Sequence, residues 1–261
     1  MNSPAQAHAQ VKIHALYRYP VKGLSPERLE AAAPGRFETI LNDRAYALEN
    51  GPSGFDPRAP AWQPKVKFLC GMKNARLASL DTRFTDADEM FTIRRGGETL
   101  LRENLASETG RAAVERFFEA FMEEEKRGAI RLLRVPGHAF TDQAKKAVSL
   151  INLATVRELE AMIGKPVHPL RFRGNIFFDG LAAWSENDLV GRTIRIGTAT
   201  ATVFKTTNRC AATEVNPETA MRDIPIPQIL RERRDSVVLG IYAEIETSGR
   251  FAEGDTIEIL R

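Results

Sequence analysis

The sequence predicts a mainly β protein with a few helices, of the α+β class. Three observations support this prediction. Short alternating or β-branched runs bounded by Gly and Pro recur along the chain, and only three segments have a helical period. The composition, with 43% hydrophobic and 27% charged residues, is that of an ordinary globular protein. Many short strands with few helices favour a barrel or curled sheet over a doubly wound βαβ fold.

Four runs in the first hundred residues are predicted to be strands because their residues alternate in polarity or are β-branched. They are residues 11–18, 45–49, 66–69 and 90–94. Segments 20–26 and 50–64 are rich in Gly, Pro and Ser. We expect these two segments to be loops long enough to contact a ligand.

The hydrophobic period changes in residues 110–126, where an amphipathic helix is predicted. Val114, Phe117, Phe118 and Phe121 recur at steps of three and four residues, with Arg and Glu between them. We expect this aromatic stripe to face the core rather than a cofactor.

The second half of the chain is predicted to be rich in strands. Residues 128–136 are expected to form one strand, and the polar connector 137–146 to separate two domains. A helix is predicted to follow the N-cap Asn152 and to end at Gly164. A short helix is expected at residues 226–234. The other strands are predicted at residues 175–178, 193–196, 198–205, 237–246 and 256–260.

The overall charge and hydropathy exclude several classes of protein. Lys and Arg number 37 against 34 Asp and Glu, and a net charge of +3 does not indicate a nucleic-acid-binding protein. No stretch approaches the ~20 apolar residues of a membrane-spanning helix. Residues 1–10 have no basic region followed by an apolar run, so we expect a flexible tail and a cytoplasmic protein without a membrane partner.

Several common catalytic and binding motifs are absent from the sequence. It contains no P-loop, no GxGxxG after a strand, no HExxH and no GxSxG elbow. The two cysteines, Cys70 and Cys210, form no CxxC pair and are too few to hold an iron–sulfur cluster. A single cysteine remains available as one metal ligand.

Cys210 lies at the end of a predicted strand, next to Arg209 and after Thr206, Thr207 and Asn208. A neighbouring guanidinium favours the thiolate, which is the form that binds a soft metal or attacks sulfur. The alternative is that Cys210 is a small buried hydrophobic residue, as free cysteines often are.

Two arginines alternate with an aromatic residue in Arg171-Phe172-Arg173, just before the strand expected at 175–178. Alternation in an extended segment would place both guanidiniums on one face, where they suit a phosphate or another dianion. A solvated edge strand with ion pairs explains the same pattern.

Three further polar turns lie in the first half of the chain. They are Tyr19-Pro20-Val21-Lys22, Asn42-Asp43-Arg44 and Asp56-Pro57-Arg58. Taken alone, each is an exposed turn.

Together these segments resemble the MOSC family, whose domain is named after the C-terminal region of molybdenum cofactor sulfurase. The first part of the chain is similar to the family's N-terminal β-barrel domain through Lys22, Arg44 and Arg58. The second part resembles the MOSC domain itself, and the Arg209-Cys210 pair is the most specific match. The other matching segments are residues 149–152, 171–175, 215–219, 240–242 and 254–255.

The resemblance implies an architecture of a flexible tail (1–10), a smaller N-terminal barrel-like β domain (11–136) and a MOSC β-barrel (137–261). In relatives that bind molybdenum, such as the mitochondrial amidoxime-reducing component, the cysteine that matches Cys210 is the protein ligand of the metal. The family is also linked with pyridoxal phosphate binding.

The resemblance further implies a binding site for the molybdenum cofactor, Mo-molybdopterin. Its phosphate carries close to two negative charges, so charged donors from distant parts of the chain are expected around it. The residues implied in this role are Lys22, Arg44, Arg58, Arg173, Asn175 and Arg209, with Asp142, Thr207 and Asn208 as further candidates.

Three functions follow from the resemblance. The first is a molybdenum oxidoreductase that reduces N-hydroxylated or N-oxide compounds, with Cys210 as metal ligand and an external reductase or ferredoxin as electron donor. The second is a sulfur carrier in which Cys210 bears a persulfide for a metal–sulfur cluster or cofactor. The third is a non-catalytic module that binds the cofactor. Residues 225–234 are either a partner-docking patch or a plain surface helix.

Overall fold

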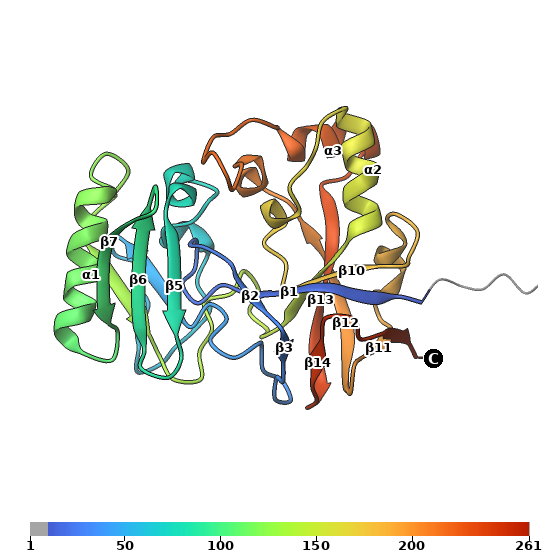
Figure 1. Cartoon of the computed structure of the whole chain (residues 1–261), viewed down its shortest axis with the longest axis horizontal. Helices are drawn as coiled ribbons and strands as arrows, with labels where there is room; N and C mark the ends of the chain where they lie inside the picture. The colour runs from blue at the N-terminus through green and yellow to red at the C-terminus, as the bar shows by residue number, and fades with distance from the viewer. Residues whose placement is uncertain (1–9, 261) are drawn as a thin grey trace, which may run out of the picture.

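The computed structural model describes residues 10–260, which form a mainly β fold with three α-helices (Figure 1). This confirms the predicted α+β class. The helices are α1 (Glu108–Phe121), α2 (Leu153–Ile163) and α3 (Ile226–Arg234), and the 3₁₀ turns are η1 (Lys65–Lys67), η2 (Ala75–Ser79), η3 (Pro169–Phe172), η4 (Ser185–Leu189) and η5 (Ala211–Glu214). The strands are β1 (Lys12–Arg18), β2 (Glu27–Leu29), β3 (Ala31–Ala32), β4 (Tyr46–Asn50), β5 (Asp81–Thr85), β6 (Met90–Arg95), β7 (Glu98–Asn104), β8 (Ile130–Arg134), β9 (Val148–Asn152), β10 (Ile176–Asp179), β11 (Thr193–Ile196), β12 (Ala199–Asn208), β13 (Val238–Thr247), β14 (Phe251–Ala252) and β15 (Ile257–Ile259).

The largest sheet contains eight strands in the order β15-β11-β12-β13-β9-β10-β1-β2. Its neighbours are antiparallel except for the β9–β10 pair. The N-terminal strand β1 pairs with β10, with Leu16 opposite Ile176, and crosses the sheet region beside β10 in Figure 1. The first strands of the chain therefore belong to the same sheet as its C-terminal half, although residues 11–136 were expected to form a separate domain.

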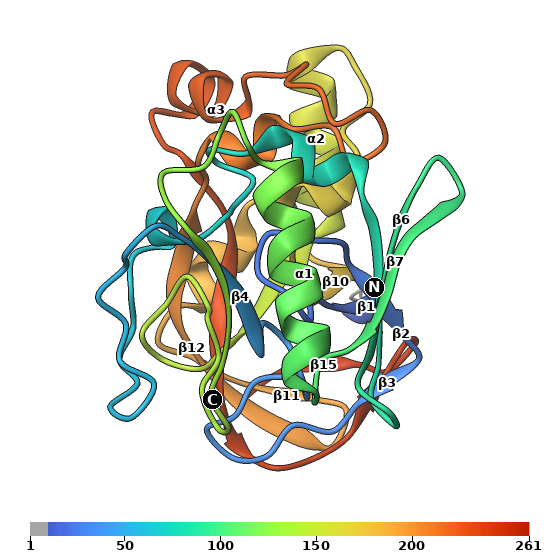
Figure 2. The ribbon, with the colours of Figure 1, turned by 90° about the vertical axis from the view of Figure 1, so that its left-hand side faces the viewer.

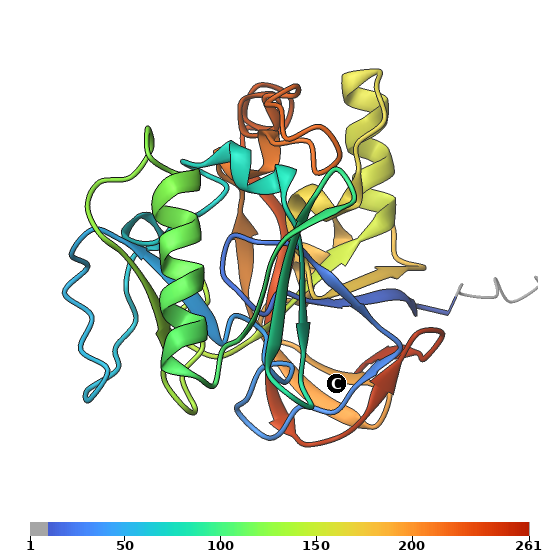
Figure 3. The same cartoon turned by 60° about the vertical axis from the view of Figure 1, so that its left-hand side comes forward.

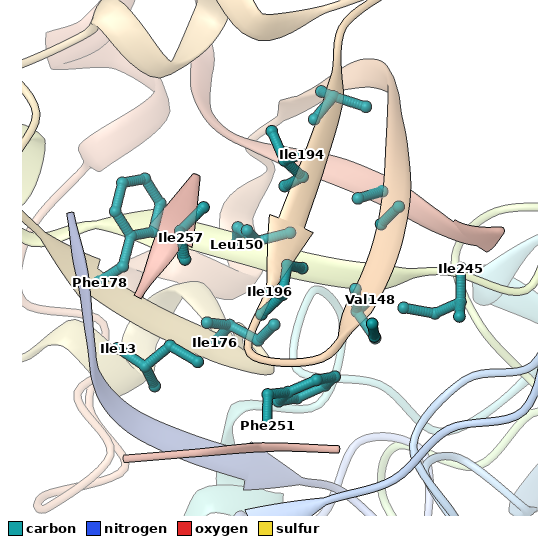
Figure 4. Packing of buried hydrophobic residues seen from close by; sticks show 14 of the residues in the cluster. Ile13, Val148, Leu150, Ile176, Phe178, Ile194, Ile196, Ile245, Phe251 and Ile257 are labelled. Carbon is teal, nitrogen blue, oxygen red and sulfur yellow. The ribbon is translucent and has the colours of Figure 1, made fainter. Parts of the chain in front are cut away.

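The core of this sheet is built from alternating side chains. In β12, Ala199, Ala201 and Val203 are buried and alternate with partly exposed threonines. Figure 4 shows Ile13 and Phe251 packing with isoleucines of the central strands. Residues from both ends of the chain thus share one hydrophobic core.

A second lobe holds the three-stranded sheet β5-β6-β7 together with α1. Ser107 caps α1 by accepting a hydrogen bond from the Gly110 N–H at 3.0 Å. Val114 and Phe118 on one face of the helix are fully buried. Figure 2 shows α1 covering this side of the molecule, with β6 and β7 beside it. The aromatic stripe is therefore part of a hydrophobic core, as predicted.

Helix α2 follows the predicted capping signals. The Asn152 side chain accepts a hydrogen bond from the Ala154 N–H, and Gly164 ends the helix in the left-handed conformation with φ 73°. Helix α3 has the predicted bounds. In Figure 3, the teal segment that contains η2 lies close to the orange segment that leads into α3.

Two local predictions are wrong. Residues 66–69 form no strand: η1 occupies Lys65–Lys67, and Phe68 makes only an isolated bridge with Glu49. The segment before β10 is not extended either, because Pro169 starts the 3₁₀ turn η3. The turn ends at Arg173, which has φ 50°. Arg171 and Arg173 therefore do not alternate as in a strand.

Candidate functional site

A cavity of about 270 Å³ lies between segments from both halves of the chain. The first half contributes Lys22, Arg44 and the segment around Cys70. The second half contributes the 141–149 segment, the end of η3 and the end of β12. Of the residues implied by the resemblance, the cavity is lined by Lys22, Arg44, Asp142, Arg173, Asn175, Thr207, Asn208, Arg209 and Cys210.

Cys210 is half-buried and lies directly after β12, at the start of η5. Lys65 Nζ donates a hydrogen bond to its Sγ at 3.5 Å. The Thr213 hydroxyl donates to the Cys210 carbonyl at 2.9 Å and holds the turn after the strand. The sulfur therefore faces a polar cavity, whereas Cys70 is only 5% exposed.

A chain of charges connects Lys22 to Cys210. Asp142 accepts from Lys22 Nζ at 2.5 Å and from Lys65 Nζ at 3.1 Å. Burial by itself would raise the pKa of Asp142, but the charges of the two lysines outweigh it and hold the pKa below its ordinary value. Burial lowers the pKa of Lys22, and Asp142 offsets only part of this effect.

Arg44 and Arg173 stack on the same aromatic ring. Their central guanidinium carbons lie 4.6 Å and 4.3 Å from the ring centroid of Tyr19. Asp43 accepts a hydrogen bond from the Tyr19 N–H at 2.8 Å, and its other oxygen pairs with Arg44. Burial raises the pKa of Tyr19 to about 12. Tyr19 thus offers a neutral aromatic surface to the two cations.

Arg209 is held by main-chain carbonyl groups rather than by a carboxylate. Its Nε donates to Leu239 O at 2.7 Å and its Nη1 donates to Phe172 O at 2.9 Å. Burial lowers the pKa of its guanidinium to about 10. A Cβ on Gly240 would lie 2.9 Å from Nη2, so this glycine leaves space for the guanidinium.

Four buried polar atoms of the cavity residues have no hydrogen-bond partner within residues 10–260. They are Arg171 Nε, Arg173 Nη2, Arg209 Nη2 and Thr207 Oγ1. A buried donor without a partner costs about 1–3 kcal/mol. Unpartnered donors gathered at one cavity indicate a ligand rich in acceptor oxygens.

Three of the other residues implied by the resemblance, Asn175, Asn208 and Arg58, are respectively buried, exposed at the cavity and remote from it. The Asn175 side chain accepts from Ser149 Oγ at 2.9 Å and donates to Tyr17 O at 3.1 Å, so its amide joins β1 to β9. Asn208 is exposed at the end of β12. Arg58 is not brought to the cavity, because its side chain is 92% exposed in the loop that follows β4.

Arg171 also differs from expectation. Its Nη2 forms an ion pair with Asp223 at 2.7 Å, and its Nη1 donates to Glu214 O at 2.9 Å. This guanidinium lies at the cavity wall but is used to hold the segment after η5. The predicted pair of free guanidiniums on one face is therefore wrong.

Sequence reasoning missed Lys65, Tyr19 as the ring between two arginines, and Tyr242 in the cavity wall. Lys65 follows Pro64 in a polar stretch that carries no local signal for a site. Tyr19 and Tyr242 both lie in segments that match the family, but the resemblance assigned neither of them a role.

The charge of the cavity is strongly positive. Eight lysines and arginines line it against the single carboxylate of Asp142. No group of three His, Cys, Asp or Glu side chains within residues 10–260 could hold a metal ion. The arrangement suits an anionic ligand.

Comparisons with known proteins give one family match. Residues 137–258 match the family model described as MOSC domain. No curated protein matches the sequence significantly. No helix of the described part of the chain is both long and apolar enough to cross a membrane.

The chain is similar to several solved structures at low identity. YuaD from Bacillus subtilis is 13% identical with a TM-score of 0.45, over 96% of this chain and 95% of that one. YiiM from Geobacillus stearothermophilus is 18% identical with a TM-score of 0.35, over 44% of this chain and 54% of that one. YiiM from Escherichia coli is 19% identical with a TM-score of 0.31, and this chain again spans 54% of its length.

Proposed function

Since this chain carries a MOSC domain over residues 137–258, we propose that it is a molybdenum-cofactor oxidoreductase that reduces N-hydroxylated or N-oxide compounds. MOSC domains are associated with the molybdenum cofactor. The proposal depends on whether the residues of the cavity fit that cofactor.

The donor set fits a pterin that carries a phosphate and a dithiolene. A phosphate monoester has nearly two negative charges, which Lys22, Arg44 and Arg173 can balance from different elements. The unpartnered Arg173 Nη2 and Thr207 Oγ1 offer donors that a phosphate or pterin would satisfy. A dithiolene supplies two sulfurs, so one protein thiolate, that of Cys210, completes the sulfur ligands.

When bound, the group would supply a metal that exchanges electron pairs with an N–O bond. The chain's own residues hold and orient it. Lys65 Nζ fixes the direction of the Cys210 side chain by its hydrogen bond to Sγ. Asp142 holds both Lys65 and the buried Lys22 in place through its hydrogen bonds to their Nζ atoms.

The reaction also needs electrons and protons from outside the site. Reduction of an N-hydroxylated compound consumes two electrons and two protons and releases the amine and water. The two cysteines of this sequence are too few for an iron–sulfur cluster. We therefore assign the electrons to an external reductase or ferredoxin and the protons to water at the cavity mouth.

The observation that supports this function best is the half-buried Cys210 sulfur in a cavity lined by eight cationic side chains. The test is molybdenum and pterin analysis of protein purified from a molybdenum-replete host. We expect both in the wild type, loss of molybdenum in Cys210→Ala and loss of pterin in Arg173→Met. The matched variants Cys70→Ala and Arg195→Met should keep both.

The same experiment separates the other functions. A mass increase of one sulfur atom on Cys210, without molybdenum, would instead support a sulfur carrier. Bound molybdopterin without turnover of N-hydroxylated compounds, even with a chemical reductant, would support a non-catalytic module.

A further inference from the structure

A second hollow, of about 430 Å³, adjoins the cationic cavity. It lies between the η2 segment of the first half and the segment after η5, which are neighbours in Figure 3. We call it the apolar groove and define it by Pro26, Ala75, Ala78, Leu170 and Pro217, which are all half-buried.

The apolar groove and the cavity share one wall. Gly23, Gly71, Arg171, Arg173 and Ala212 line both. A Cβ on Gly71 would lie 3.6 Å from the Cβ of Ala212, so two of the smallest residues meet in this wall. Ala212 follows Cys210 by two positions. The groove therefore ends next to the sulfur-bearing turn.

The unpartnered donors of the groove lining, Arg171 Nε and Arg173 Nη2, belong to the wall shared with the cavity, and its two hydroxyl groups are already bonded. The Ser25 hydroxyl donates to Leu80 O at 2.9 Å, and the Ser79 hydroxyl donates to Arg76 O at 2.8 Å. Because both hydroxyls already bond the main chain, a ligand in this part of the groove would contact mainly apolar side-chain atoms. Small side chains such as Ala75 and Ala78 leave space for a ligand.

Three charged and exposed side chains line the groove away from the shared wall, and we call this part its outer end. Asp81 pairs with Arg83 at 3.5 Å, and Glu218 adds a further carboxylate, so these three side chains have a net charge of −1. A cationic or neutral substituent is therefore favoured at the outer end, and a carboxylate is disfavoured.

We propose that the apolar groove binds the body of the substrate, with the N–O group at the Gly71–Ala212 end. The substrate class is then an N-hydroxylated compound whose carbon skeleton is apolar and whose remote group is neutral or cationic. This inference rests on the proposed function, because it takes the reaction centre to lie at Cys210.

The first test is Ala78→Phe, which fills the groove, with the exposed Ala161→Phe on α2 as matched control. The probes are a phenyl amidoxime and hydroxylamine, which has no carbon skeleton to occupy the groove. Ala78→Phe should raise KM and the calorimetric Kd for the phenyl amidoxime by roughly tenfold or more. It should leave hydroxylamine turnover and the molybdenum and pterin contents unchanged. The control Ala161→Phe should change neither the turnover of either probe nor these contents.

The second test reverses a charge at the outer end with Glu218→Lys, against the exposed Glu124→Lys as control. It should weaken binding of an amidoxime that carries a remote amine several-fold more than that of the neutral one. Glu218 lies in a surface segment, so this variant keeps the inference testable if Ala78→Phe does not fold.

Two results would overturn the inference. Loss of pterin in Ala78→Phe would assign the groove to the cofactor. Unchanged binding of the phenyl amidoxime in Ala78→Phe, or of the amine-bearing amidoxime in Glu218→Lys if Ala78→Phe does not fold, would show that the groove does not bind the substrate. Failure of the proposed function gives a different result, because the wild type would then reduce neither probe. Calorimetric binding to the wild type and to Ala78→Phe still tests the groove in that case.

Discussion

Arg44 Nη2 donates a hydrogen bond to the main-chain carbonyl of Arg173 at 3.0 Å, although 129 positions separate the two residues in sequence. Both residues have left-handed backbones, with φ values of 53° and 50°. Two guanidiniums held together repel each other, and the Tyr19 ring and Asp43 offset this repulsion before any ligand binds. The pair is therefore preorganised for an anion.

Replacement of Tyr19 by Leu should weaken anion binding, because the two guanidiniums lose the surface on which they stack. We expect unfolding free energy to fall by about 2 kcal/mol or more and affinity for inorganic phosphate to fall about tenfold. Tyr19→Phe loses only the 3.2 Å hydrogen bond to Gly174 O, worth about 1 kcal/mol, and should keep phosphate affinity. Urea unfolding and calorimetric titration measure both. Equal phosphate affinity in the two variants would contradict the stacking role.

Asp142→Asn should destabilise the protein at neutral pH by about 2 kcal/mol. This is less than for a fully buried pair, because the Asp142 side chain is 39% exposed. The folded state lowers the pKa of Asp142, so its contribution is complete above the unfolded value of about 3.9 and is lost as pH falls below it. Denaturation at several pH values should show the difference from wild type shrinking in acid. Asp56→Asn, at a carboxylate that pairs with the exposed Arg58, should show little difference at any pH.

The two cysteines should differ in their reaction with an alkylating reagent. Cys210 is half-buried at the cavity, whereas Cys70 is 5% exposed. We expect Cys210 to be modified in the folded protein and Cys70 only after unfolding. Peptide mass spectrometry of protein alkylated with and without urea identifies each site. Equal labelling of both cysteines without urea would show that the cavity wall opens around Cys70.

Gly240→Ala should displace Arg209 as well as strain the backbone. A Cβ there would lie 2.7 Å from Leu150 O and 2.9 Å from Arg209 Nη2, at a φ of +84°. The matched control is Gly254→Ala, which has a φ of +87° and no atom within 4 Å of the added Cβ. The control should lower the free energy of unfolding by about 1–2 kcal/mol, because alanine is strained in the left-handed conformation. Gly240→Ala should lower it clearly more, because its Cβ also clashes with its neighbours. Thermal unfolding of both variants measures this difference. Equal losses of stability would show that the residues around Arg209 shift without cost to make room for the Cβ.

Elements with strong local signals were predictable from the sequence. Helix α2 lies between Asn152 and Gly164, and α3 occupies residues 226–234 as expected. Strands β5 and β7 were missed. Most of the β7 side chains are exposed, and β5 buries only Thr82 and Phe84, so neither strand contains a long hydrophobic run. Both pair with β6 through short hairpins, with Thr85 opposite Met90 and Arg95 opposite Glu98.

The site was predictable only in part, because it depends on contacts between residues that are distant in sequence. Resemblance identified Lys22, Arg44, Arg173 and Cys210, which line the cavity together. No local pattern distinguishes Lys65 from its neighbour Lys67, and only the packing of the long loop brings Lys65 Nζ to the Cys210 sulfur. The side chain of Arg58, in the same loop, lies in solvent.

The pairing of β1 with β10 has a consequence for biosynthesis. Tyr17 and its partner Asn175 are 158 positions apart, so the first strand leaves the ribosome long before its neighbour exists. A fragment cut at residue 137 would expose the edge of β10 and invite aggregation through unpaired main-chain groups. We therefore expect that neither half of this chain folds when it is produced alone.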